Sequence, residues 1–355
     1  MDVDLQASSE KILKKLLEDT DAKEGETILM NPSTGEILVM AHVPTYNPAD
    51  GMMFGFDLRY ANKAANLLYE PRSLFSLFTI AAGLEENTTD LNSEFSCLPS
   101  KKENNESNIC NTFHGQHQRI ADIIRNKCST TISAVGEKLR ENLETYAKRF
   151  QFEEQFTIEL SYIKNSYIPS TKDVNNTTFR DFTLGKGIGI TSLQLITGFA
   201  TIVNEGEMMK PIIIKEIHDY DGKKVRKLNT VPVKRVITNK NAVGLKKSIE
   251  NVIKDPNEKY PLGGISGKMG LFITDELKKY YLYKQGYYSK ETLIDTYLGY
   301  FTANDTKYVM MVTIQEPNDK KKYNETLGAY GVYCDIKAKM IGQKPKINTD
   351  FAVLK

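Results

Sequence analysis

The sequence predicts a mixed fold of helices and strands, in the α/β (α+β) class. Residues 26–32 and 35–41 are apolar runs joined by a Pro-Ser-Thr-Gly turn, which indicates a hairpin near the amino terminus. Residues 297–301 and 308–314 are two further apolar, strand-like runs near the other end of the chain. Between these pairs, apolar residues recur at helical spacing, most clearly within 191–203. The predicted strands therefore lie toward both ends of the chain, with helices between them.

Length and composition allow one large domain, or a domain with a lobe. The chain has 355 residues, of which 40% are hydrophobic, enough for a substantial core. The formal net charge of +2 gives no global basic field, so nothing favours nucleic acid as a partner. The four cysteines are too few for a disulfide scaffold. No stretch is long and apolar enough to span a bilayer, and no signal peptide is evident.

Local patterns predict the remaining elements in order. Residues 8–20 form an amphipathic helix, because their apolar side chains fall on one face. Residues 161–180 are polar and rich in Asn, Ser and Thr, so we expect a loop there. Further helices are expected over 120–139 (with a break), 140–152, 239–252 and from Tyr330 through Met340, and a hairpin over 210–225 turns at Asp221-Gly222.

One stretch, residues 69–86, stands out for its chemistry. A loop ends at Pro71, which is well placed near a helix start, and apolar residues then repeat at helical spacing. Ser73 therefore lies in the first turn, where free backbone N–H groups and the helix dipole favour an anion. Such a position suits an acyl-transfer serine, since its own amide can help to hold an oxyanion. The alternative is an N-cap serine on an ordinary core helix.

The residues around Ser73 resemble the active-site serine region of the penicillin-binding protein transpeptidases. That pattern is Tyr-Glu-Pro-Gly-Ser-x-x-Lys, and this chain has Tyr69-Glu70-Pro71-Arg72-Ser73, with Ser76 in place of the lysine. The run Asn-Pro-Ser-Thr-Gly-Glu-Ile-Leu-Val-Met-Ala at 31–41 and the run Gly-Ile-Gly-Ile-Thr-Ser-Leu-Gln-Leu at 187–195 are similar to landmarks of the same family, in the same order. The resemblance thus covers nearly the whole chain.

This resemblance implies a serine β-lactamase/penicillin-binding transpeptidase-like fold, with an antiparallel five-stranded sheet covered by helices and an inserted helical lobe. It implies a single domain over 1–355, with the lobe at 85–185 and the sheet core drawn from 1–60 and 205–345. The active groove would lie between the lobe and the strand bearing Lys268. Relatives would carry a membrane anchor and a pedestal domain ahead of this region, which were either removed or never present here.

The family's second and third motifs are altered as well. Counting back from Gly136 places Lys127-Cys128-Ser129 at the second motif, Ser-x-Asn, and the shifted run Ser129-Thr130-Thr131 also lacks the asparagine. Lys268-Met269-Gly270 matches the third motif, Lys-Thr-Gly, without its hydroxyl. By resemblance, the catalytic positions are Ser73, Ser76, Lys127, Ser129 and Lys268, and the substrate-binding positions are Arg72, Met269, Gly270 and Leu271, the last through its backbone amide.

Members of this family acylate their serine with the D-Ala-D-Ala end of a peptidoglycan stem peptide and pass the acyl group to an amine. A serine hydroxyl needs a neighbouring base, which the family assigns to the lysine that this chain lacks. Three altered motifs predict a catalytically impaired domain that acts as a scaffold or regulator of cell-wall synthesis. The alternative is an active D,D-transpeptidase or carboxypeptidase acylated on Ser73, with Lys127 as substitute base. That role needs a lysine pKa depressed by burial or by the charges of Arg72 and Lys268.

The resemblance also implies a location and partners, and no cofactor. It places the protein at the outer face of the bacterial cytoplasmic membrane, assuming an anchor absent from this chain. The implied partners are a stem peptide or β-lactam, if the groove still binds one, and membrane proteins of cell division or elongation. A third hypothesis is a binding module that uses the Tyr-rich insertion at 274–296, and the alternative there is a solvated loop.

Cysteine and histidine residues gather before the second motif. Cys97, Cys110, His114 and His117 offer ligands that zinc accepts. In part of the resembling family a Phe-x-Cys, a later Cys and a His-Gly recur in this order. The spacing matches no short zinc pattern, so buried thiols and a capping or core histidine are the alternative. We assign no metal site from the sequence.

Overall fold

The computed structural model describes residues 1–45, 62–97, 110, 112–153, 158–160, 163–252, 263–271, 293–315 and 328–342. A seven-stranded sheet lies at the centre of these residues, in the order β2-β1-β11-β10-β9-β3-β4. Its strands are β1 (Gly25–Met30), β2 (Ile37–Val43), β3 (Leu68–Glu70), β4 (Ile190–Thr191), β9 (Gly263–Leu271), β10 (Leu293–Ala303) and β11 (Thr306–Gln315). Every pair is antiparallel. The five longer strands confirm the predicted sheet, and the short β3 and β4 extend it.

Strands from the two ends of the chain lie side by side in this sheet. Strand β1 pairs with β11, with Leu29 opposite Met310. Strands β10 and β11 form a hairpin whose turn residues, Asn304 and Asp305, have φ values of 48° and 58°. Asn and Asp tolerate this left-handed conformation, which the tight turns of hairpins require. The hairpin therefore forms where two apolar runs flank these residues.

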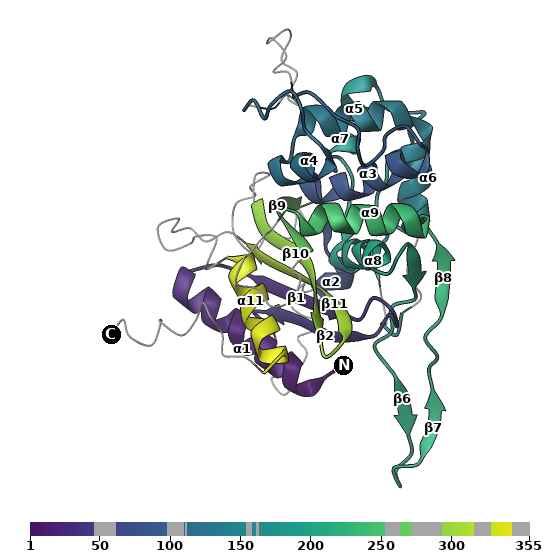
Figure 1. Cartoon of the computed structure of the whole chain (residues 1–355). Helices are drawn as coiled ribbons and strands as arrows, with labels where there is room; N and C mark the ends of the chain where they lie inside the picture. Colours follow the sequence, from purple (N-terminus) through teal and green to yellow (C-terminus); the bar gives the residue numbers. More distant parts are fainter. Residues whose placement is uncertain are drawn as a thin grey trace.

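Helices cover both faces of the sheet (Figure 1). Helices α1 (Val3–Thr20) and α11 (Ala329–Met340) cover one face, and α8 (Ser192–Val203) and α2 (Lys63–Asn66) pack on the other side. Alternate residues of β10 point to opposite faces, so Tyr297 packs on Tyr333 of α11, with ring centroids 4.6 Å apart, while Leu298 joins the other core. Helix α1 begins before the predicted residue 8, because Asp2 accepts a hydrogen bond from the amide of Leu5.

Helix α8 is buried along its whole length and confirms the helix predicted over 191–203. Thr191 and Gln194 form a capping box, in which each side chain accepts a hydrogen bond from the backbone N–H of the other residue. Gly198 lets aromatic rings approach the helix, since a Cβ there would lie 2.8 Å from Phe152 and 2.9 Å from Phe78. This contact joins the sheet side of the core to the helical lobe.

The lobe contains α3 (Ser76–Glu85), α4 (Ile120–Asn126), α5 (Ser129–Leu139), α6 (Glu141–Arg149) and α7 (Asn176–Thr183). The break predicted within 120–139 is confirmed, because Lys127 ends α4 with a φ of 51°. The loop predicted over 161–180 is wrong in its last part, where α7 begins after its N-cap, Asn175. Phe179 and Phe182 give α7 one buried face, which the polar composition of the segment obscured.

Outside these layers, short strands form two small sheets, β5 (Glu207–Met209) with β8 (Pro232–Arg235) and β6 (Glu216–His218) with β7 (Lys224–Lys227). The β6–β7 pair confirms the hairpin at Asp221-Gly222 and projects from the body (Figure 1). Helix α9 (Asn239–Glu250) confirms the helix predicted over 239–252.

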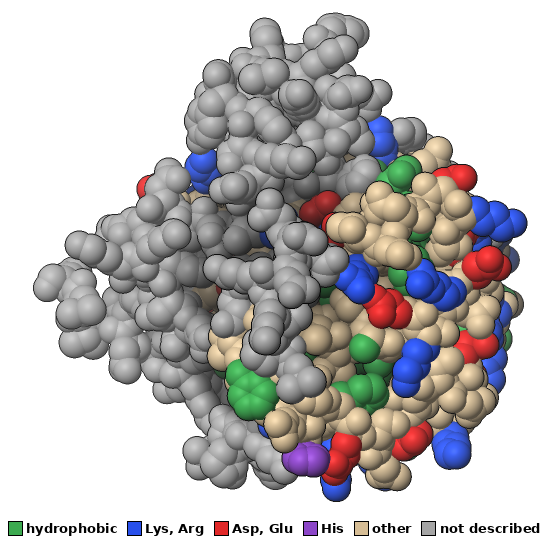
Figure 2. All heavy atoms as spheres, turned by 90° about the horizontal axis from the view of Figure 1, so that it is seen from above, with side chains coloured by type: hydrophobic (Ala, Val, Ile, Leu, Met, Phe, Trp, Pro, Cys, Tyr) green, Lys and Arg blue, Asp and Glu red, His purple; other side chains and the backbone are tan. Residues whose placement is uncertain are grey.

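On the described part of the face in Figure 2, charges of both signs are mixed and hydrophobic side chains are isolated. None of the described helices has the length and apolar character needed to cross a bilayer.

Candidate active site

Ser73 lies in a short turn fastened to the edge of the sheet. It belongs to η2 (Arg72–Phe75), a single turn of 3-10 helix between β3 and α3. Strand β3 pairs with β9, which places Glu70 opposite Gly270 and Tyr69 opposite Leu271. The predicted serine segment and the predicted third-motif strand are therefore direct neighbours. We call residues 69–76 the serine turn.

Backbone contacts hold the serine turn in place. The amide of Arg72 donates a hydrogen bond to the carbonyl of Gly185, at 3.0 Å. Gly185 has a φ of +70°, and a Cβ there would lie 2.5 Å from Cβ of Phe75 and 2.6 Å from the carbonyl oxygen of Arg72. Only glycine fits this position, because both the conformation and the close approach exclude a side chain. The turn that presents Ser73 is thus sterically fixed.

Ser76 does not replace the base that the family carries at its position. Its hydroxyl donates a hydrogen bond to the backbone carbonyl of Ser73, at 2.5 Å, and its side chain is buried. Ser73 itself is partly exposed, and no side chain among the described residues hydrogen bonds to its hydroxyl. The nucleophile position is accessible, but the described surroundings offer it no proton acceptor.

Arg72 lies across the space between the serine turn and β9. A Cβ on Gly270 would lie 2.8 Å from Nη2 of Arg72 and 3.1 Å from its Cζ, so the guanidinium rests against the glycine backbone. Nη2 also lies 3.5 Å from a carboxylate oxygen of Glu70, whose other oxygen accepts a hydrogen bond from the amide of Gly187. The Nε of Arg72 is buried and makes no hydrogen bond with the described residues. A cation thus lies beside Ser73 where the resembling pattern has glycine.

The second-motif residues lie at the junction of α4 and α5. Lys127 is exposed at the end of α4, so it lacks the burial that the substitute-base hypothesis invokes. Ser129 is the first residue of α5, and its hydroxyl lies 3.3 Å from Sγ of Cys110. Helix α5 packs on α3, the helix that follows Ser73.

The third-motif residues lie within β9. Lys268 pairs with Asp295 of β10 in the backbone register, and Leu271 pairs with Tyr69. The side chain of Met269 is fully buried in the core shared with the lobe, so it presents no group to a ligand. Gly270 contributes the surface on which Arg72 lies. The Tyr-rich segment at 274–292 lies outside the described residues, and the remaining predicted residues of this insertion belong to β10.

Three thiols and one imidazole converge just before α5. Possible ligand atoms of Cys97, Cys110, His114 and Cys128 all lie within 4.8 Å of one another. His117, which the sequence suggested as a ligand, instead pairs with Glu94 at 2.8 Å on the surface. Sequence reasoning missed Cys128, although three of the four cysteines fall between positions 97 and 128. We call these four residues the thiol cluster.

The thiols of this cluster differ in their acidity. Burial raises the pKa of Cys97 to about 11. Burial also acts to raise the pKa of Cys110, but hydrogen bonds with Ser129 and Thr130 outweigh it and bring the value to about 6. Cys110 is therefore the more acidic of these two thiols.

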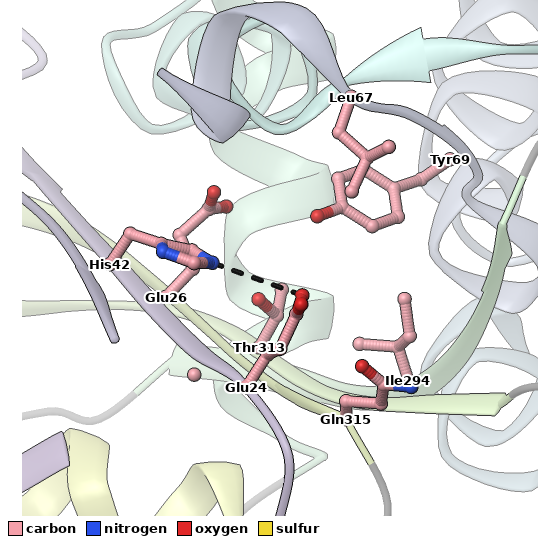
Figure 3. A pocket seen from close by; sticks show the side chains of 9 residues that line it. Glu24, Glu26, His42, Leu67, Tyr69, Ile294, Thr313 and Gln315 are labelled. Atoms are coloured by element: carbon pink, nitrogen blue, oxygen red, sulfur yellow. Dashed lines mark ion pairs between the residues drawn. The ribbon is translucent and has the colours of Figure 1, made fainter. Parts of the chain in front are cut away.

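A second group of polar side chains, partly or fully buried and outside the predicted catalytic motifs, lies at the start of β1 and on β2. Glu24, Glu26 and His42 line a small pocket with Tyr69 of the serine turn (Figure 3). Lys63 donates a hydrogen bond to Glu24 at 2.8 Å, and Nε2 of His42 lies 3.9 Å from the same carboxylate. We call Glu24, Glu26, His42 and Lys63 the carboxylate cluster. Sequence patterns gave no signal for it, because its residues come from three separate elements.

The two carboxylates of this cluster are shifted in opposite directions. Burial acts to raise the pKa of Glu24, but His42 and Lys63 outweigh it and lower the value to about 2. Burial raises the pKa of Glu26 and outweighs the nearby hydroxyl of Ser192, which acts to lower it. Glu24 is thus held as a charged partner, while its buried neighbour favours the neutral form.

The comparisons with known proteins agree on one family. The model described as "Penicillin binding protein transpeptidase domain" matches residues 25–329. Stage V sporulation protein D of Bacillus subtilis is 25% identical over 343 residues, covering 93% of this chain and 51% of that protein. Peptidoglycan D,D-transpeptidase FtsI of Buchnera aphidicola is 25% identical over 353 residues, covering 99% of this chain and 58% of that protein. The chain thus spans about half the length of the curated relatives it matches.

Solved structures share the fold at low sequence identity. The transpeptidase domain of Burkholderia pseudomallei penicillin-binding protein 3 superposes with a TM-score of 0.76 at 15% identity, covering 98% of this chain and 97% of that one. Penicillin-binding protein 3 of Mycobacterium tuberculosis, complexed with aztreonam, gives a TM-score of 0.80 at 18% identity, covering 96% of this chain and 77% of that one. The fold expected from the sequence is therefore confirmed.

Proposed function

Because this chain belongs to the penicillin-binding protein transpeptidase domain family, we propose that it is a catalytically impaired member that serves peptidoglycan synthesis as a scaffold or regulator. The observation that carries the proposal is the state of Ser76. At the family's base position, its hydroxyl is buried and donates to the carbonyl of Ser73. The proposal treats residues 1–355 as one transpeptidase-like domain with the lobe at 85–185.

The loss of the base has a large kinetic cost. Serine acylation requires a group that accepts the hydroxyl proton as the bond to the carbonyl carbon forms. A neutral serine hydroxyl cannot act as that acceptor near neutral pH, and removing a general base typically costs ~10²–10⁴ in rate. Ser76 also has its own proton engaged with the Ser73 carbonyl. On this proposal, the turn presents the serine but holds no group that takes up its proton.

Arg72 adds a second obstacle and suggests a remaining role. Its guanidinium fills the space against Gly270, beside the serine. Its side chain is 31% exposed and its ion pair with Glu70 is long, at 3.5 Å, and a carboxylate is the group that a guanidinium binds best. The groove therefore suits binding of an anionic peptide end more than turnover. A stem peptide or a β-lactam are the ligands that this proposal predicts.

The proposed location and partners follow from the relatives. One relative is named as a sporulation protein and another as a peptidoglycan D,D-transpeptidase. We therefore place this chain in cell-wall synthesis, at the outer face of the bacterial cytoplasmic membrane. That placement requires an anchor outside residues 1–355. Its protein partners would be membrane proteins of division or elongation, and the Tyr-rich insertion is the surface we propose for them.

Acylation by penicillin tests the proposal directly. The chain is incubated with excess penicillin and its intact mass is measured, next to Ser73→Ala and the double variant Ser76→Lys with Arg72→Gly. We expect little or no adduct on the wild-type chain and a gain of adduct on the double variant, because the lysine restores the base and the glycine clears Gly270. Adding Ser73→Ala to the double variant should abolish the gain. Prompt stoichiometric acylation of the wild-type chain would contradict an impaired site.

The same experiment tests the alternative, an active transpeptidase or carboxypeptidase with Lys127 as base. The retained pairing of β3 with β9 keeps Ser73 beside the third-motif strand, which favours this alternative. It predicts a wild-type adduct that disappears in both Ser73→Ala and Lys127→Ala. The exposure of Lys127 speaks against it.

A further inference from the structure

We propose that the β6–β7 hairpin is a docking site for an extended, acidic protein segment, which adds to the outer edge of β7 as a third strand. We call residues 214–235, which contain β6, β7 and β8, the basic arm. Its β6–β7 part projects from the body and points away from the helical lobe (Figure 1). Docking there does not depend on whether Ser73 is reactive, because no residue of the basic arm belongs to the serine turn.

The basic arm concentrates positive charge in a chain that is nearly neutral. Seven Lys and Arg residues and three Asp and Glu residues give residues 214–235 a formal net charge of +4, against +2 for the whole chain. Glu216 already pairs with Lys224, at 2.8 Å. Lys223, Arg226 and Lys227 have no carboxylate partner among the described residues. The unbalanced charge therefore lies along β7 and favours an acidic partner.

Exposed hydrophobic side chains gather on the same arm. Six of the ten large hydrophobic side chains that are exposed among the described residues belong to it. They are Ile214, Ile217, Tyr220, Val225, Val231 and Val233. Tyr220 is fully exposed at the tip of the hairpin, and Val225 on β7 is 65% exposed. A partner that covers such side chains gains from the burial of apolar surface as well as from charge.

The backbone of β7 has an open edge. Strands β6 and β7 form a two-stranded sheet, so β7 pairs with no second strand among the described residues. The amide of Leu228 donates a hydrogen bond to the carbonyl of Lys215, at 2.9 Å, on the side of β6. Successive residues of an antiparallel strand direct their backbone groups to opposite edges, so Lys227 directs its N–H and C=O outward. All four residues of β7 are exposed, which leaves this edge open to strand addition.

The charges also indicate which occupant fits. A second copy of the arm would bring Arg226 and Lys227 against equal charges, so pairing between copies is disfavoured. Asp219 and Asp221 lie on either side of Tyr220 at the tip. An anionic lipid surface would repel these carboxylates at the end of the hairpin. A protein strand in which acidic and apolar residues alternate suits both the charge and the exposed side chains of β7.

Contacts at its base hold the arm in a defined direction. Glu36 forms a bridge with Ile212 and an ion pair with Lys215, at 3.0 Å. The amide of Ile213 donates a hydrogen bond to the carboxylate of Glu159, at 2.9 Å. A strand that is ordered before binding loses less conformational freedom when a partner docks. The body of the domain therefore presents β7 as a ready template.

Peptide binding to the intact chain tests the docking site. The probe is a fluorescent peptide of about eight residues that alternates Glu and Val, and a peptide that alternates Lys and Val is its control. We expect the wild-type chain to bind only the Glu peptide in anisotropy measurements, and the double variant Arg226→Glu with Lys227→Glu to bind it about tenfold more weakly. Lys11→Glu with Lys14→Glu makes the same change of charge on α1 and should keep the affinity. No binding of the Glu peptide, or equal affinity of the two double variants, would overturn the proposal.

A backbone variant separates strand pairing from attraction between charges. Lys227→Pro removes the outward N–H and the charge, whereas Lys227→Ala removes only the charge. We expect the proline variant to bind the Glu peptide more weakly than the alanine variant, and the bound peptide to slow hydrogen exchange in residues 224–227 of the wild-type chain. Equal binding by the two variants would indicate a charged patch without strand addition and would contradict the proposal. Binding of phosphatidylglycerol vesicles through Arg226 and Lys227, without binding of the Glu peptide, would identify a lipid surface and would equally overturn it.

Discussion

The serine turn and the carboxylate cluster share a pocket wall, Tyr69, but different forces hold them. In the serine turn, close backbone contacts with Gly185 and a neutral hydrogen bond from Ser76 fix the geometry. In the carboxylate cluster, the charges of Lys63 and Glu24 and the burial of Glu26 dominate. The first region should respond to changes of shape and the second to changes of pH.

The comparison shows that two common guides to an active site, the order of family motifs and the presence of shifted pKa values, point to different regions of this chain. Buried groups with shifted pKa values are common at catalytic centres, and that criterion selects the carboxylate cluster and the thiol cluster alike. The order of motifs selects the serine turn, where the lysine of the family has become Ser76. Structural ion pairs shift pKa values as well, so the carboxylate cluster needs no catalytic role. The serine turn has Ser76 where the family pattern has a lysine, while the shifted carboxylates lie outside the catalytic motifs.

The largest effect is expected at Gly185, in the serine turn. Gly185→Ala forces a Cβ within 2.6 Å of the Arg72 carbonyl oxygen at a φ of +70°, which should lower the free energy of unfolding by about 2–4 kcal/mol. The matched control is Gly187→Ala, which has a φ of +68° and no atom within 4 Å of the added Cβ, and should cost about 1–2 kcal/mol. Urea unfolding measures both. Equal losses would show that steric contact does not hold the turn.

A smaller, pH-dependent effect is expected at Lys63. Lys63→Met removes the cation that, together with His42, lowers the pKa of Glu24 to about 2, and should cost about 1–2 kcal/mol at neutral pH. A carboxyl with a lowered folded pKa contributes stability above its usual pKa of 4.5, and that contribution is lost as the pH falls through about 2. The difference between variant and wild type should therefore shrink between pH 5 and pH 2 in thermal unfolding. A constant difference would show that Lys63 acts through packing alone.

At Glu26 we expect the opposite dependence of stability on pH. Its raised pKa means that the folded chain has its full stability below pH 4.5 and loses it as the pH rises through the folded pKa. Glu26→Gln stays neutral, so it should stabilise the chain by about 1 kcal/mol at pH 8 and have little effect at pH 4.5. Unfolding temperatures at the two pH values check this. A destabilised variant at pH 8 would show that the charged carboxylate has a partner that stabilises it.

The fold was largely predictable because its elements carry local signals. The opening hairpin has alternating apolar strands around a Pro-Ser-Thr-Gly turn, and α8 has a capping box at Thr191 before an apolar helix. The segment at 161–180 failed because composition outweighed the two phenylalanines, Phe179 and Phe182, that bury one face of α7. A helix of eight residues such as α7 has too few turns to show a clear 3.6-residue repeat of apolar side chains.

The candidate site residues come from motif order along the sequence, and the catalytic roles of Ser73, Ser76 and Lys268 stay predictions. Their contacts could not be predicted. The contact of Arg72 with Gly270 and the convergence of Cys128 on Cys110 depend on pairs far apart in the chain. His117, which the sequence offered as a possible ligand beside Cys97, Cys110 and His114, lies on the surface instead. Spacing along the chain cannot reveal such pairs, because tertiary packing decides them.

The smallest effect on the free energy of unfolding is expected at Ser76. It tests most directly whether the serine turn, unlike the carboxylate cluster, is insensitive to pH. Ser76→Ala removes a neutral hydrogen bond to the Ser73 carbonyl and should cost about 0.5–1 kcal/mol. Neither group titrates between pH 5 and pH 8, so the loss should be the same at both values, unlike the effect at Glu26. Ser133→Ala is the matched control, since its buried hydroxyl has no partner among the described residues and its removal should be neutral or slightly stabilising. A loss at Ser76 that changes with pH would mean that its hydroxyl is coupled to a titrating group, and the serine turn would then retain part of a proton path.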